Sequence, residues 1–309
     1  MSLSEQKKLK KKFKTTTLLG RGTYGCVFVA VDPLSKTQVA AKIECRSVSD
    51  SLNIEKDFYL RLLNVPGIPQ ITSLSMERVG SSLADLLDDY QTGFSLSTVL
   101  RIAIQLINRL RDVHRRGVIH RDINPGNLAI GRGDKSGVVY ILDFGLAGFF
   151  VKERGEHIPY EQKFRSWIGT TEYMSLNVNN GVKGSRRDDL ESLGYTLIKL
   201  YKGSLPWEGV KGTENQIICK IRAFKRRMSL EELCDGLPLP FLIYMTYCRN
   251  MEFEKEPDYD FLIQLFQDHL TKTCSGKDSF EWEDKENQDN EEAEGRQTSK
   301  CVFLSCFGK

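Results

Sequence analysis

The chain contains no hydrophobic run that approaches the ~18–20 residues needed for a membrane-spanning helix. Its lysine-rich N-terminus lacks the apolar core of a secretory signal, so we expect a cytoplasmic location, with the nucleus as a second compartment. Because no export signal is present, we expect the 8 cysteines to be reduced thiols. None of them forms a CxxC pair or a cysteine–histidine cluster, which argues against a zinc site. The 40% hydrophobic and 28% charged residues exclude a wholly disordered or fibrous chain.

Positive charge is unevenly distributed along the 309 residues. The formal net charge is +3, but residues 280–294 hold eight acidic side chains and one lysine, a net of −7, so the remainder carries +10. This asymmetry fits anionic partners for the basic body and contact between body and tail, or a solvated tail that only aids solubility. Charge alone leaves both interpretations open.

Short stretches rich in β-branched residues dominate the N-terminal part of the chain. Residues 14–19, 26–31 and 38–44 are separated by glycine-rich and Asp-Pro turns and predict an antiparallel meander. Residues 50–64 predict a helix, which the prolines that follow would end.

The later part of the chain is helical in pattern. Apolar residues recur at helical spacing in residues 95–116, 188–201 and 259–268, and each of these segments predicts an amphipathic helix. The expected plan is a small β-rich lobe, a larger helical lobe and an acidic tail.

A glycine-rich segment, GRGTYGCV at residues 20–27, fits the pattern GxGxxGxV. Glycines at these positions let backbone amides approach phosphate oxygens. In a dinucleotide-binding fold a helix would follow at once, whereas the residues that follow here read as a strand. The loop therefore joins two strands and is expected to cover a nucleotide. The candidate nucleotide-binding residues here are Leu19, Gly20, Gly22, Gly25 and Val27.

Three further motifs carry residues suited to phosphoryl transfer. Lys42 in VAAK could reach nucleotide phosphates from its strand, and Glu55 on the first helix is its expected ion-pair partner. HRDINPGN begins at residue 120, and DFG begins at Asp143. Phosphoryl transfer needs a proton acceptor and oxygen ligands for Mg²⁺, roles that suit Asp122 for the first and Asn127 with Asp143 for the second.

With these motifs in this order, the chain resembles a eukaryotic protein kinase. The closer likeness is to the casein kinase 1 family. Its marks are LNIE at 52–55, GIP at 67–69, HIPY at 157–160, SLN at 175–177 in place of the usual Ala-Pro-Glu, SRRDDLESLG at 185–194, GSLPW at 203–207 and CRN with PDY within 248–259.

The resemblance implies an α+β, bilobal protein kinase fold over residues 14–270, with an N-lobe at about 14–80 and a C-lobe at about 81–270. A Lys-rich arm (1–13) would precede it, and an acidic, disordered tail (271–309) would follow. The implied activity is transfer of the ATP γ-phosphoryl to serine or threonine of protein substrates, with ATP and Mg²⁺ as cofactors. Lys42, Asp122 and Asn127 would be catalytic, in a monomer that binds no nucleic acid.

The resemblance also assigns roles around the nucleotide and the catalytic loop. Met76 would be the gatekeeper, while Glu77 would offer its carbonyl and Val79 its amide to adenine. Asp189 would hold the backbone of the HRD turn by hydrogen bonds. Thr170 matches the residue whose hydroxyl contacts the base aspartate in serine/threonine kinases, which argues against tyrosine specificity.

The chain departs from the family in three places, and two of them, Asn124 and a shortened segment after residue 69, keep a pseudokinase or scaffold as the alternative function. Asn124 replaces a lysine beside the transferring phosphoryl, so the rate of transfer should fall. Glu172 replaces an arginine of the family's substrate-phosphate pocket, which questions a preference for pre-phosphorylated substrates. The chain between residues 69 and 80 is several residues shorter than in typical members, so we expect a shortened hairpin there, and the assignment of the hinge residues depends on this shortening.

The end of the chain permits one further interpretation. Cys301 and Cys306 lie among apolar residues, so acylation could attach the protein to a membrane. The alternative, which we favour, is a tail with unmodified thiols.

Overall fold

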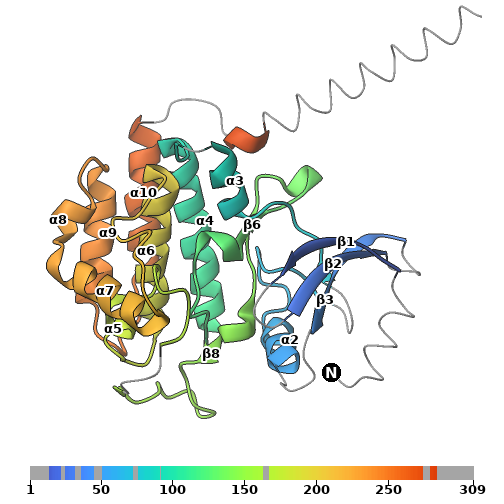
Figure 1. Ribbon diagram of the computed structural model, residues 1–309, viewed down its shortest axis with the longest axis horizontal. Helices are drawn as coiled ribbons and strands as arrows, with labels where there is room; N and C mark the ends of the chain where they lie inside the picture. The colour runs from blue at the N-terminus through green and yellow to red at the C-terminus, as the bar shows by residue number, and fades with distance from the viewer. Residues whose placement is uncertain are drawn as a thin grey trace, which may run out of the picture.

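The computed structural model describes residues 14–21, 25–31, 36–44, 51–71, 76–90, 92–162, 167–273 and 279–283, and the structural statements below concern these residues. They form two lobes, one a small antiparallel sheet with a helix beside it and the other a larger body of helices (Figure 1). The predicted α+β, bilobal architecture is confirmed. No helix within these ranges is long and apolar enough to cross a membrane.

The N-lobe sheet has the strand order β1-β2-β3-β4. Its strands are β1 (Lys14–Arg21), β2 (Gly25–Val31), β3 (Gln38–Glu44) and β4 (Met76–Glu77). The predicted meander is confirmed, and β1 runs on into the glycine-rich segment, where Gly20 pairs with Val27. Val27 in turn lies opposite Lys42. Because directly opposite residues of antiparallel strands point to the same face, Val27 and Lys42 share one face of the sheet.

Helix α2 (Ser51–Arg61) joins the two lobes. Its Phe58 ring lies 5.1 Å from the Phe149 ring and its Tyr59 ring 5.2 Å from the Phe144 ring, so the helix packs on the C-lobe through aromatic contacts. The sequence predicts that this helix runs to residue 64, but it ends at Arg61. Asn64 adopts a left-handed conformation with φ 63°, which a continuing α-helix does not allow.

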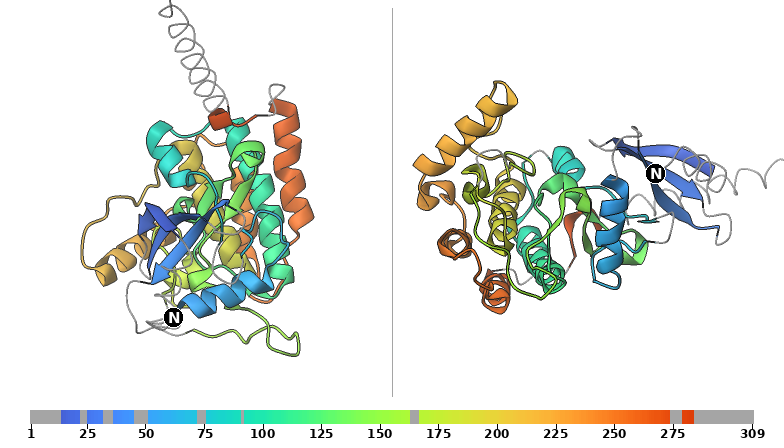
Figure 2. Two further views of the ribbon diagram at one scale, coloured as in Figure 1. Left: turned by 90° about the vertical axis from the view of Figure 1, so that its right-hand side faces the viewer. Right: turned by 90° about the horizontal axis from the view of Figure 1, so that it is seen from below.

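The C-lobe is built on two long helices, α4 (Leu96–Arg115) and α6 (Arg186–Lys202), which lie side by side in Figures 1 and 2. Its helices are α3 (Leu83–Tyr90), α4 (Leu96–Arg115), α5 (Leu176–Asn179), α6 (Arg186–Lys202), α7 (Glu214–Arg227), α8 (Leu230–Leu233), α9 (Leu239–Asn250) and α10 (Tyr259–Thr273). Helix α4 begins where the Ser95 side chain accepts from the Thr98 N–H and ends before Gly117, which has φ 77°. Helix α6 is buried on nearly all sides and forms the centre of this lobe.

Short strands and single turns fix the loops that face the N-lobe. Strand β5 (Val118–Ile119) pairs with β8 (Gly148–Phe149), and β6 (Leu128–Ile130) pairs with β7 (Val139–Ile141). The turns η1 (Pro125–Asn127), η2 (Gly133–Lys135) and η3 (Phe144–Leu146) complete this layer. The HRD and DFG motifs lie between these elements, on a support of buried strands.

The region predicted to be a disordered tail from residue 271 begins differently. Helix α10 continues to Thr273, and residues 279–283 lie against the C-lobe. Phe280 and Trp282 stack with their ring centres 4.5 Å apart, and both are almost fully buried. The Trp282 indole N–H donates to the Ser136 carbonyl at 3.1 Å. Burial of these two rings holds residues 280–282 against the C-lobe. The rest of the predicted tail, residues 274–278 and 284–309, lies outside the described residues.

Candidate active site

The face of the sheet that carries Lys42 is the N-lobe side of the site. Val27 on β2 lies directly opposite Lys42, Gly25 lies opposite Glu44 on the same strand pair, and Gly20 lies on β1 opposite Val27. Leu19, which precedes Gly20 in the chain, is 46% exposed. Contact of these residues with a nucleotide remains a prediction. Gly22 lies outside the described residues, as do Cys301 and Cys306.

Lys42 joins the two lobes through two carboxylates. Its Nζ lies 2.8 Å from Glu55 Oε2 on α2 and 3.2 Å from Asp143 Oδ1 of the DFG motif. Burial acts to lower the pKa of Lys42, but the negative charges of Glu55 and Asp143 outweigh it and raise the pKa above its usual value. Lys42 is therefore a fixed cation, and the expected pairing with Glu55 is present.

The DFG motif is held from its hydrophobic side. Phe144 is fully buried, with its ring 5.2 Å from Tyr59 and 4.8 Å from His120. The Asp143 N–H donates to the Tyr59 hydroxyl at 3.0 Å, and Asp143 has φ 60°, an unusual backbone conformation for a non-glycine residue. This geometry directs the Asp143 carboxylate toward Lys42 and leaves the side chain 41% exposed.

One carboxylate on α6, that of Asp189, supports the backbone of the HRD turn. Asp189 accepts from the backbone N–H of His120 at 2.7 Å and of Arg121 at 2.8 Å, so its expected role is confirmed. The His114 ring nitrogen lies 3.0 Å from the same carboxylate. Burial acts to raise the pKa of Asp189, but these hydrogen bonds outweigh it and lower the pKa.

Asp122 faces Asn127 and the segment after DFG. Its Oδ2 accepts from Asn127 Nδ2 at 2.8 Å, and its Oδ1 accepts from the backbone N–H of Thr170 at 2.7 Å. We expected the Thr170 hydroxyl to contact Asp122, but the group that does so is the Thr170 backbone N–H. That hydroxyl lies 3.3 Å from Asn124 Nδ2, because Asn124 occupies the space beside it.

Close approach of the backbone makes the Thr170 contact possible. Gly169 has φ 109°, and a Cβ at this position would lie 2.4 Å from the Arg121 carbonyl oxygen. A side chain here would push the segment away from the catalytic loop.

Asp143 and Asn127 form a donor set that suits a hard divalent cation. The Asn127 amide nitrogen is committed to Asp122, to its carbonyl at 2.9 Å and to its carboxylate at 2.8 Å, so the amide oxygen is the atom left to coordinate. The residues that the sequence predicts for metal binding therefore fit that role.

The candidate hinge residues begin on β4, which pairs with β3. Met76 and Glu77 form β4, opposite Ala40 and Val39, and Ile71 bridges to Met76. Residues 72–75, where a shortened hairpin is expected, lie outside the described residues. The Glu77 carboxylate accepts from Lys135 Nζ at 2.6 Å and from the Tyr140 hydroxyl at 3.2 Å. The adenine contacts of the Glu77 carbonyl and the Val79 amide remain predictions.

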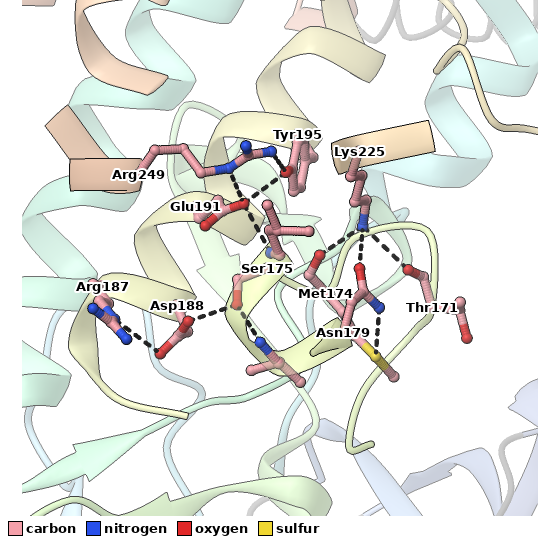
Figure 3. A network of polar contacts seen from close by, with 12 residues as sticks. Thr171, Met174, Ser175, Asn179, Arg187, Asp188, Glu191, Tyr195, Lys225 and Arg249 are labelled. Carbon is pink, nitrogen blue, oxygen red and sulfur yellow. Dashed lines mark hydrogen bonds and ion pairs between the residues drawn. The ribbon is translucent and has the colours of Figure 1, made fainter. Parts of the chain in front are cut away.

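A polar network lies behind the segment that follows Thr170 (Figure 3). Ser175 Oγ donates to Asp188 Oδ1 at 2.5 Å, and the Leu176 N–H donates to Glu191 Oε1 at 2.9 Å. Arg249 Nε lies 2.6 Å from the same Glu191 oxygen. Burial raises the pKa of Asp188 to about 6, although the Ser175 hydrogen bond opposes that rise.

Sequence analysis missed several residues that hold the site in place. Tyr59, Lys135 and Lys225 carry no motif of their own. For Lys225 a signal exists, because it continues the buried spacing of Ile218 and Ile221 along α7.

A family model of the protein kinase domain matches residues 13–235, which is most of the chain and includes every motif of the site. Members of this family use ATP and a divalent metal to phosphorylate proteins. On this match and the geometry above, the chain belongs to the protein kinase family.

Proposed function

We propose that the protein is an active serine/threonine kinase that transfers the γ-phosphoryl of Mg·ATP to protein hydroxyls. The observation that carries the proposal is Lys42, which contacts Glu55 at 2.8 Å and Asp143 at 3.2 Å at the same time. An active protein kinase needs both the lysine–glutamate ion pair and the DFG aspartate in place. Asp122 would accept the proton of the attacking hydroxyl, and Mg²⁺, when bound, would neutralise charge on the phosphates.

A casein kinase 1-like character is part of the proposal. Three of the segments that carry this resemblance contact one another, since Ser175 bonds Asp188 and Glu191 bonds Arg249. These contacts give a physical reason for the segments to occur together in one sequence.

Serine/threonine specificity is carried by the resemblance of Gly169 and Thr170 to the segment of serine/threonine kinases, whereas the Thr170 backbone N–H that donates to Asp122 positions the segment without bearing on specificity. The test is a phosphotransfer assay of the purified full chain with Mg·ATP and casein, followed by mass spectrometry. We expect phosphoserine and phosphothreonine. Products that are mainly phosphotyrosine would contradict the specificity.

A pseudokinase is the second candidate, and Asn124 favours it. Asn124 Nδ2 donates to the Asp122 carbonyl at 3.0 Å, and its Oδ1 accepts from the Gly126 N–H at 2.9 Å, so a neutral amide occupies the place of a cation. Binding of Mg·ATP, seen as a rise in melting temperature, without phosphate transfer to casein would select this candidate.

A further inference from the structure

Lys225 on α7 is a charged side chain in the interior of the C-lobe, with only 1% of its surface exposed. Its Nζ donates to the Met174 carbonyl at 2.6 Å, to Asn179 Oδ1 at 3.1 Å and to the Thr171 carbonyl at 3.3 Å (Figure 3). All three acceptors belong to the segment 170–179, whose first residue, Thr170, contacts Asp122 of the catalytic loop.

Two aromatic rings surround the same ammonium. Nζ lies 4.6 Å from the centre of the Tyr195 ring and 4.9 Å from that of Trp207, within the range of a cation–π interaction. The Trp207 indole N–H donates to the Glu172 carbonyl at 2.9 Å. Lys225 and Trp207 together therefore bind three backbone carbonyls of one short stretch.

The N-terminal end of the segment 170–179 contacts the proposed catalytic base, Asp122. Thr170 donates its N–H to Asp122 at 2.7 Å, and the next residue, Thr171, already contacts Lys225. An apolar side chain could fill the space of Lys225 without the cost of burying a charge. The hydrogen bonds to the segment are thus the distinctive contribution of the ammonium.

We propose that Lys225 is a positioning residue for the protein substrate, which fixes the segment 170–179 in the conformation that receives the acceptor peptide beside Asp122. The inference rests on the protein phosphotransfer proposed above. It concerns binding of the peptide, and it leaves the contacts of the nucleotide with Lys42 unchanged.

The charge of Lys225 is sensitive to pH near neutrality. Burial lowers its pKa to about 7, and the charged groups that face it are Glu172 on the segment, Glu191 on α6 and Arg249 on α9. Tyr195 faces it with its ring. Below pH 7 the ammonium has three protons for three acceptors. Above pH 7 the neutral amine has two protons and a lone pair that repels a carbonyl oxygen, so the segment should loosen as pH rises.

The first experiment compares Lys225→Met with Lys220→Met. Lys220 lies on the exposed side of α7 and, within the described residues, donates only to the Lys211 carbonyl, which makes it a matched control. Since Lys225→Met leaves buried carbonyls without a donor, we expect the peptide KM to rise about tenfold and the ATP KM to stay unchanged. An unchanged peptide KM, or equal rises in both KM values, would overturn the proposal.

The second experiment uses Asn179→Asp, which places a carboxylate 3.1 Å from Nζ. The new charge stabilises the ammonium, so the pH at which the peptide KM begins to rise should move up by about one unit. If the pH dependence of the peptide KM were identical in the variant and the wild type, the proposed role of the ammonium would be wrong. A lysine with a purely structural role would leave this pH dependence unchanged.

A readout that needs no catalysis separates this inference from the proposed function. We expect backbone amides of residues 170–179 to exchange with deuterium about tenfold faster in Lys225→Met than in the wild type, with no change in α4. Absence of any transfer by the wild type would refute the proposed function alone. Unchanged exchange in the variant would refute the positioning role alone.

Discussion

Two neighbouring carboxylates at the start of α6, Asp188 and Asp189, support two different regions of the molecule. Both are buried, with 4% and 2% of their surfaces exposed. Asp189 accepts from two backbone N–H groups of the catalytic loop, and a His114 ring nitrogen lies 3.0 Å away; its pKa is lowered. Asp188 contacts Ser175 of the segment 170–179, termed the substrate segment because we propose that it has a role in substrate positioning, and burial raises the pKa of Asp188 to about 6.

The difference follows from the number of good donors around each carboxylate. Asp188 accepts from Ser175 Oγ and the Ser185 N–H, while the Arg187 guanidinium stays 3.8 Å away. The hydrogen bonds at Asp189 therefore outweigh the effect of burial and lower its pKa, whereas at Asp188 burial has the larger effect and raises the pKa. The catalytic loop is held by a charge that stays ionised over the physiological range, and the substrate segment by groups that titrate near neutrality, Asp188 and Lys225.

The largest effect should come from the catalytic side. Asp143→Asn removes the carboxylate that contacts Lys42 and the expected metal, so we expect phosphate transfer to fall by about a thousandfold or more. The melting temperature should change little, because the side chain is 41% exposed. Transfer close to that of the wild type would make the metal assignment wrong.

The second effect tests the support of the catalytic loop. In Asp189→Asn one of the two accepting oxygens becomes an NH2 group, which opposes one of the N–H donors of His120 and Arg121 and removes the charge, so we expect the free energy of unfolding to fall by about 3–5 kcal/mol. Urea denaturation measures this, with Asp188→Asn as the matched variant, for which we expect a smaller loss. Equal losses at pH 7 would remove the distinction between the two carboxylates.

The third effect concerns pH. The folded-state pKa of Asp188 is about 6 and its usual value is 3.8, so the folded protein binds this proton more tightly than the unfolded chain. The contribution of Asp188 to the free energy of unfolding is thus greatest below pH 3.8. It falls by up to about 3 kcal/mol as pH rises to 6 and is constant above.

Urea denaturation of the wild type and Asp188→Asn between pH 4.5 and 7 measures this contribution as the difference between the two proteins. Asp189 does not disturb the comparison, because its lowered pKa places its own transition below pH 3.8. A difference that does not vary with pH would show that Asp188 keeps an ordinary pKa.

The catalytic side could be predicted from sequence because its residues lie in short motifs. HRD and DFG each combine local backbone geometry with a chemical group, so Asp122 and Asp143 stand out in the sequence, and Lys42 in VAAK becomes a candidate because these motifs follow it in order. The meander and the long helices also followed, since hydrophobic periodicity reports burial directly.

The substrate side could not be predicted in the same way. Lys225 is the first of three consecutive basic residues, Lys225, Arg226 and Arg227, and only the first is buried. Its partners lie 46 to 54 positions earlier in the chain, a separation that no local pattern encodes. Phe280 and Trp282 were likewise taken into the acidic tail because charge dominates their neighbours, although two aromatic rings in a polar stretch are a sign of burial.

The smallest effect sharpens the substrate side of the comparison. Glu172 presents a carboxylate where an arginine fork would pair with a phosphate, so the wild type should gain little from a phosphorylated residue upstream of the acceptor. Glu172→Arg should create a preference for such a primed peptide of about 5- to 150-fold, or ~1–3 kcal/mol. Asn124→Lys is the contrasting variant. A charge there lies beside Asp122 and should act on primed and unprimed peptides alike. Paired-peptide kinetics of the wild type and both variants decide the matter, and a wild type that strongly prefers the primed peptide would mean that another basic group binds the phosphate.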